Sequence, residues 1–149
     1  MPKINVDLIK KLREETGAPI VRVKEVLDKF GPDQALEILR KEGFAKAEKR
    51  AGRATEQGKI FVYQHHTGKV VGIVELLCET DFVARNDLFE ALGKDLAMQA
   101  ASMGEKDFAE QEFIKDPAKK IGDLIKEVIA KTGENVTIGR VFKVELGKK

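Results

Sequence analysis

Apolar residues recur at helical spacing through the first 43 residues, in three segments that glycine and proline separate. Asn5 precedes the first segment, and Pro19 and Pro32 open the other two, where a first helical residue is often proline. The apolar positions are Val6, Ile9 and Leu12, then Ile20, Val23, Val26, Leu27 and Phe30, and finally Leu36 and Leu39. The segments end at Gly17, Gly31 and Gly43. The pattern predicts a compact three-helix module over residues 1–43.

The pattern changes twice in the next part of the chain. Residues 44–57 are rich in alanine, lysine and arginine and carry little apolar surface, which predicts a helical or half-ordered linker. From Gly58 the period becomes two, and a second run, residues 70–78, is β-branched and apolar. Because Thr67 and Gly68 separate the two runs, we expect a β-hairpin.

Two helices and a last strand complete the predicted core domain, residues 58–149. One amphipathic helix is expected over residues 86–102, and Pro117 is expected to open another. The strand, residues 136–146, is expected to place alternate side chains on one face: Val136, Ile138, Arg140, Phe142, Val144 and Leu146. We expect it to join the hairpin in a three-stranded antiparallel sheet with helices packed on one face, which is an α+β fold.

A short segment between the hairpin and the next helix combines an acid with a large aromatic. Thr80 can cap a helix there, and Asp81 lies favourably in its first turn. Phe82 does not share the predicted apolar stripe of Leu88 and its successors, so it suits insertion into a partner's pocket. From the segment alone, the commoner interpretation is a phenylalanine that folds back onto the sheet.

A second candidate contact surface lies at the turn between the first two predicted helices. Ile20 and Val21 are consecutive, so they cannot both face the core of one helix. One of them should leave apolar surface exposed beside Arg13, and such a pair is a plausible partner hot spot. An incidental surface residue explains the pattern equally well.

Composition excludes several classes of protein. At 149 residues and 42% hydrophobic, the chain can build one sizeable core or two small ones. Its net charge of +2 comes from 27 basic and 25 acidic residues that are closely interspersed, so nucleic acid is not the default partner. With Cys78 as the one cysteine, an intrachain disulfide is impossible. Residues 1–3 carry no apolar signal segment and no run is long enough to cross a membrane, so we expect the cytosol.

Candidate sites for bond-breaking chemistry are weak. His65 and His66 would point to opposite faces of a strand, so at most one could join Cys78 at a metal, and we expect none. A phosphate-cradling glycine loop is missing, and no cofactor is expected. The basic cluster could touch RNA, but nearby glutamates favour a solvated linker face. Its members are Lys46, Lys49, Arg50 and Arg53.

Several stretches resemble the elongation factor Ts family, whose members are exchange factors for elongation factor Tu. The segment of residues 79–86, ETDFVARN, resembles the family signature, and residues 12–19, LREETGAP, resemble its opening motif. Residues 49–53, 133–136 and 142–147 match further motifs in the same order. The resemblance implies a ubiquitin-associated (UBA)-like module followed by a core domain, and an activity without covalent chemistry.

The resemblance also implies roles for individual residues. Thr80, Asp81, Phe82 and Val83 would intrude near the nucleotide and magnesium site of elongation factor Tu. Arg13, Ile20 and Val21 would contact its GTPase domain. The alternative is a UBA-like adaptor that binds protein without promoting exchange, which would not need Asp81 and Phe82.

The chain resembles a short form of the family, with residues for one core half and without the helical insert that some members place near residues 104–117. Short forms are understood to pair, so the resemblance implies a homodimer. The sheet face opposite the helices supports this, because on one register it exposes four large side chains. They are Phe61, Tyr63, Val71 and Val141.

Overall fold

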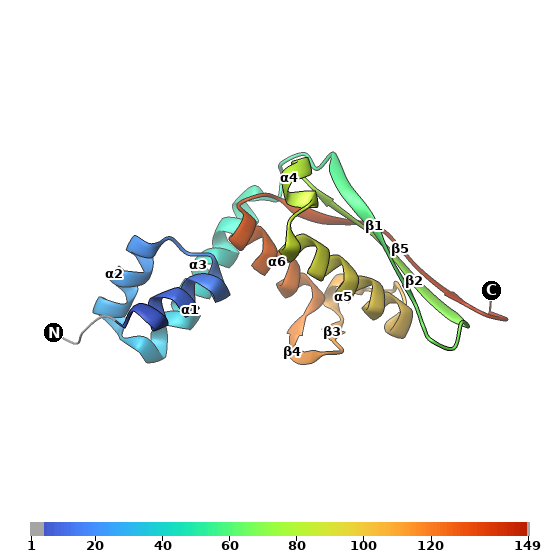
Figure 1. Ribbon diagram of the computed structural model, residues 1–149, viewed down its shortest axis with the longest axis horizontal. Coiled ribbons are helices and arrows are strands. Elements are labelled where there is room, and N and C mark those ends of the chain that lie inside the picture. The colour runs from blue at the N-terminus through green and yellow to red at the C-terminus, as the bar shows by residue number, and fades with distance from the viewer. Residues whose placement is uncertain (1–4, 149) are drawn as a thin grey trace.

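The computed structural model describes residues 5–148, so residues 1–3, where the leader segment was considered, lie outside the described residues. Three helices come first, α1 (Val6–Thr16), α2 (Ile20–Phe30) and α3 (Pro32–Arg50). A three-stranded sheet and two long helices follow and form the α+β fold that the sequence predicts (Figure 1). Within the described part, no helix is long and apolar enough to cross a membrane.

Local signals set the ends of the first helix as predicted, whereas α2 begins at Ile20 and Pro19 is its extended N-cap, not its first helical residue. The side chain of Asn5 accepts a hydrogen bond from the Asp7 N–H at 2.9 Å, and Gly17 ends α1 in the left-handed conformation at φ 72°. The apolar faces meet in a small core made of Ile9, Leu12, Val23, Val26, Ala35 and Leu39. Arg22 links α2 to α3, because its Nε donates to the Glu42 carboxylate at 3.0 Å.

The predicted helix end at Gly43 is wrong, because α3 continues without a break to Arg50. A side chain at Gly43 would place its Cβ 3.1 Å from Cβ of Ala130 in α6 (Ile121–Thr132). The glycine therefore allows two helices to approach closely. Ala47, one turn further on, is buried in the main core. The α3 helix thus joins the module to the rest of the protein as one continuous element (Figure 1).

The sheet has the order β1-β2-β5, all antiparallel, and the predicted hairpin is confirmed. Its strands are β1 (Gln57–Gln64), β2 (Val70–Cys78) and β5 (Val136–Glu145). One face carries α5 (Asp87–Met103) and α6 (Figure 1). The main core lies between these helices and the sheet, with Phe61, Val74, Leu76, Phe89 and Leu96 among its buried members.

The prediction that alternate residues of the last strand share one face is wrong. The β2–β5 register shifts between Val74 and Leu76, so that Glu75 faces a bulge around Arg140. The extra residue reverses the alternation. Val136 is buried on the helix side, whereas Phe142, beyond the bulge, is 47% exposed on the opposite face. The Glu75 carboxylate accepts hydrogen bonds from the backbone N–H and the guanidinium of Arg140 at this point.

The same register corrects the predicted composition of the free sheet face. Phe61 is buried, and Tyr63 and Val141 pack against the main core, so they lie on the helix side. Of the four predicted residues, Val71 alone pairs on the free face, opposite Val144 of β5. That face is still apolar. We call it the open face; it carries Ile60, Val62, Val71, Ile73, Phe142 and Val144.

Two boundaries near α6 and α5 also differ from prediction. Pro117 does not open a helix but lies in β4 (Asp116–Lys120), which pairs with β3 (Glu112–Phe113) in a small hairpin after the 3₁₀ turn η1 (Phe108–Glu110). The α6 helix instead begins at Ile121, where the Asp123 carboxylate accepts from the Lys120 N–H at 3.1 Å. In α5, Phe89 takes the core position that the sequence assigned to Leu88.

Candidate functional site

The segment that follows β2 forms a single helical turn, α4 (Asp81–Ala84), before α5 begins. Thr80 precedes it with extended backbone, and its Oγ1 accepts from the Val83 N–H at 3.4 Å, which confirms the predicted cap. Asp81 lies in the first turn and pairs with Arg85 at 2.7 Å, with both side chains exposed. The acid therefore remains accessible at the surface.

Phe82 is 88% exposed, the highest value among the large apolar side chains of the described residues. Val83 and Ala84, the next two residues, are buried in the main core. One turn of helix thus divides its residues between two directions, with Asp81 and Phe82 outward and Val83 and Ala84 inward. Val83, which the sequence grouped with the outward residues, anchors the turn instead.

The turn is held by hydrogen bonds to Glu134 and Asn135, which lie 54 and 56 residues later in the chain than their partners. The Thr80 N–H donates to Glu134 Oε1 at 2.9 Å, and the Thr80 hydroxyl donates to Glu134 Oε2 at 2.6 Å. In the opposite direction, the Asn135 N–H donates to Glu79 Oε2 at 2.8 Å. The buried thiol of Cys78 donates to the Thr80 carbonyl at 3.2 Å, and burial raises its pKa, so the thiol stays protonated. We call residues 79–84 the Asp-Phe turn.

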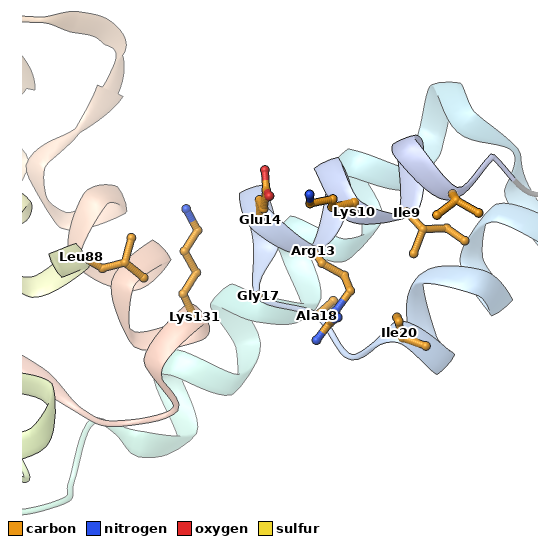
Figure 2. A pocket seen from close by; sticks show the side chains of 10 residues that line it. Ile9, Lys10, Arg13, Glu14, Gly17, Ala18, Ile20, Leu88 and Lys131 are labelled. Atoms are coloured by element: carbon orange, nitrogen blue, oxygen red, sulfur yellow. The ribbon is translucent and has the colours of Figure 1, made fainter. Parts of the chain in front are cut away.

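A groove of about 840 Å³ separates the N-terminal module from the core domain. Arg13 and Ile20 lie on the module side, and Leu88 of α5 and Lys131 of α6 lie on the other (Figure 2). The full lining, which defines the module groove, is Val6, Ile9, Lys10, Arg13, Glu14, Gly17, Ala18, Ile20, Leu88 and Lys131. Val21 is 65% exposed but does not line it. The groove has an apolar floor and a mainly basic rim.

Close backbone contact fixes the two walls of the module groove relative to each other. A Cβ on Gly17 would lie 2.6 Å from Cα of Lys131, so α1 ends directly against α6. The positive φ of Gly17 makes the same position unfavourable for other residues. Leu88, which lines the groove, follows the Asp-Phe turn by four residues, so only a short stretch of chain connects the turn to the groove wall.

Sequence reasoning missed Leu88, Lys131, Glu134 and Asn135. Leu88 was assigned to the core because it falls on an apolar stripe, yet it is 40% exposed at the groove. Glu134 and Asn135 belong to a motif that was quoted for its resemblance alone. Buried Asn135 donates from its side chain to the carbonyls of Ala51 and Arg53, so it also ties down the end of α3. Their partners are distant in the chain, and no local pattern indicates them.

Other candidate sites do not assemble. The argument that His65 and His66 lie on opposite faces of a strand was wrong, because β1 ends at Gln64 and the two residues belong to the turn that follows. Their ring centroids are 4.1 Å apart. Over residues 5–148, no three histidine, cysteine or acidic side chains gather as metal ligands. In the basic cluster, Arg50 donates to the Ile129 carbonyl at 3.4 Å and the Arg53 guanidinium lies 3.8 Å from the Glu79 carboxylate. Both arginines therefore make contacts within the protein itself.

Comparison with known proteins shows the family of this chain. The family model described as elongation factor TS matches residues 79–149, which include the Asp-Phe turn and its partner Glu134. Elongation factor Ts of Thermotoga petrophila is 40% identical, with 98% of each chain covered. The chain belongs to the elongation factor Ts family. Elongation factor Ts of Leptospira biflexa and of Herpetosiphon aurantiacus are each 37% identical, with 97% of this chain and 98% of the relative covered.

The chain is shorter than these relatives. Each of these alignments spans 194 positions, whereas the chain has 149 residues. These elongation factor Ts relatives therefore carry segments that have no counterpart here. The Asp-Phe turn and the module groove are both present in the shorter chain.

Proposed function

We propose that the protein promotes the release of GDP from elongation factor Tu, acting in the cytosol. The observation that carries the proposal is the Asp-Phe turn, which presents Phe82 88% exposed beside an accessible Asp81. Phe82 projects from a turn whose next two residues are buried in the core, and an aromatic presented in this way suits insertion into a partner's pocket. Family membership supplies the partner, because the relatives are named elongation factor Ts.

In this proposal, the module of residues 1–43 anchors elongation factor Tu and the core of residues 58–149 carries the exchange function. Arg13 and Ile20 contact the GTPase domain at the module groove, and Val21 extends this contact on the neighbouring surface. The basic rim and apolar floor suit a helix that carries both apolar and acidic side chains. Asp81 and Phe82, held by Thr80 and Val83, then reach the nucleotide and magnesium site.

The physical basis of exchange is a coupling free energy between two ligands of one partner. A nucleotide bound at nanomolar affinity is held by about 12 kcal/mol. The factor binds more tightly to a conformation of elongation factor Tu in which phosphate and magnesium contacts are weaker, so its own binding energy shifts the population. Because coupling is reciprocal, rebinding of nucleotide expels the factor. The step breaks no covalent bond, so the protein would not be an enzyme in that sense.

A homodimer forms part of the same proposal. The open face exposes Ile60, Val62, Phe142 and Val144, with exposed fractions between 47% and 62%. Burying a phenylalanine contributes about 1.5–3 kcal/mol, so pairing two such faces across a two-fold axis is favourable. The open face lies opposite the helices, which leaves the Asp-Phe turn free for elongation factor Tu and predicts a 2:2 complex.

The test is the rate at which elongation factor Tu releases labelled GDP with and without the protein. We expect acceleration that rises with concentration and saturates. Stable binding of elongation factor Tu without faster release would refute the proposal and favour the adaptor. A salt-dependent shift of RNA, with no effect on GDP, would instead assign the function to the basic cluster.

A further inference from the structure

The α4 helix is too short to orient Phe82 by itself. A single helical turn of four residues lies far below the length at which a helix is stable in water. Its direction must therefore come from tertiary contacts. On one side these are the buried Val83 and Ala84, which hold the turn onto the core. Asp81 and Phe82, the first two residues of the turn, are exposed and are not buried in the core.

Two contacts hold Thr80, which precedes these exposed residues: the Cys78 thiol donates to its carbonyl, and Glu134, which lies 54 residues away in the chain, accepts from its N–H and hydroxyl. The two carboxylate oxygens of Glu134 accept separately from the N–H and the hydroxyl of Thr80, at 2.9 and 2.6 Å. Since the hydroxyl proton points to Glu134, the oxygen's lone pairs are left to accept from the Val83 N–H. Glu134 thus holds the Thr80 hydroxyl in the orientation that caps the turn.

Glu134 itself lies in the short corner between α6 and β5, and the residues on either side of it are held in place. Gly133 ends α6 in the left-handed conformation. Asn135, the residue after Glu134, is only 2% exposed. The Asn135 N–H donates to Glu79, so two neighbouring residues of the corner grip two neighbouring residues of the Asp-Phe turn. Lys131 of the module groove lies one turn earlier in α6.

We infer that Glu134 is a positioning residue for nucleotide release, acting through Thr80 to hold Asp81 and Phe82 in the projecting orientation. This rests on the proposed function. A side chain that is already oriented loses less conformational entropy when it enters a pocket. Since Glu134 does not line the module groove, its loss should change the rate of release within the complex and leave the affinity of the complex unchanged.

The experiment measures GDP release from elongation factor Tu over a range of concentrations of the full-length protein, which separates the maximal rate from the half-saturating concentration. Glu134→Ala removes both acceptor oxygens and should lower the maximal rate about tenfold, a factor that corresponds to about 1.4 kcal/mol. The half-saturating concentration should stay the same. Glu105→Ala, which removes an exposed acid beyond the far end of α5, is the matched control and should change neither value.

Variants at Thr80 distinguish positioning from a loss of folding. Thr80→Val removes the hydroxyl that Glu134 and the Val83 N–H share, and should reproduce the effect of Glu134→Ala, whereas Thr80→Ser should restore the rate. The double variant should be no slower than either single variant, because both break one unit. Thermal melts show whether each variant is folded, and Glu134→Gln, which keeps one acceptor oxygen, should fall between wild type and Glu134→Ala.

An unchanged maximal rate in folded Glu134→Ala would overturn the inference, as would effects of Glu134→Ala and Thr80→Val that simply add. Hydrogen exchange of the Val83 amide tests the orienting contact without any partner and should become faster in Glu134→Ala. If that exchange did not change, Glu134 would not support the cap. A wild-type protein without effect on GDP release would instead refute the proposed function, whatever the Val83 amide does.

Discussion

Replacement of Phe82 by alanine separates a partner contact from a structural role. The ring is 88% exposed, so it gains little from folding. Full burial of a phenylalanine is worth about 1.5–3 kcal/mol, and a tenth of that is roughly 0.2–0.3 kcal/mol. We therefore expect Phe82→Ala to lower the melting temperature by less than about 2 °C.

The effect on exchange should be far larger. If the ring enters a pocket of elongation factor Tu, its removal forfeits most of the same 1.5–3 kcal/mol, which corresponds to roughly a tenfold to hundredfold slower release. Melting temperature and GDP release are measured on the same preparation, with the rate expressed per folded molecule. Such a difference between the two measurements cannot arise from a simple loss of folded protein.

A control uses another exposed phenylalanine remote from the Asp-Phe turn. Phe30, at the end of α2, is 41% exposed and so gains more from folding than Phe82 does. Phe30→Ala should therefore cost more stability and leave the exchange rate unchanged. The opposite pattern, with Phe82→Ala strongly destabilised and fully active per folded molecule, would show that Phe82 serves the fold and would refute the reasoning.

Three further predictions concern other parts of the structure. Gly43→Val should lower the stability by about 1–3 kcal/mol, because its Cβ would meet Ala130, and a melt that matches wild type would mean that α3 and α6 separate freely. Phe142→Asp on the open face should give a folded monomer near 16.6 kDa by sedimentation, whereas an unchanged mass, or a wild-type protein that is already monomeric, would exclude the proposed dimer. Arg22 holds the pKa of Glu42 below its ordinary value of 4.5 by hydrogen bonding, so the pair stabilises the fold above that pH and less as the pH falls through the lower folded value. The difference in melting temperature between wild type and Glu42→Gln should therefore shrink on acidification, and a constant difference would disprove the linkage.

Features that depend on neighbours in the chain were predictable from the sequence. Asn5, Gly17 and Thr80 act on backbone groups within a few residues of themselves, so their roles in starting or ending helices follow from local chemistry. The alternation of residues 58–65 and 70–78 likewise predicts a hairpin without reference to the rest of the fold. The spacing of Phe82 was compatible with an outward side chain, but the segment alone favoured a phenylalanine folded back onto the sheet, and the structure decided for the outward position.

Features that depend on distant neighbours were decided by the tertiary structure. Glycine is common where helices end, so the sequence predicts an end at Gly43. In the structure α3 continues, and Gly43 is the position at which α6 packs closely against it. One bulge opposite Glu75 reverses the faces of β5, since side chains alternate with a period of two and a single extra residue exchanges them. Glu134 supports Thr80 across 54 residues, a contact that no local pattern encodes. Sequence periodicity therefore determined the long helices and the three strands of the main sheet, whereas the small β3–β4 hairpin escaped it. The contacts between elements decided where helices continue, which strand face is open and what holds Phe82 outward.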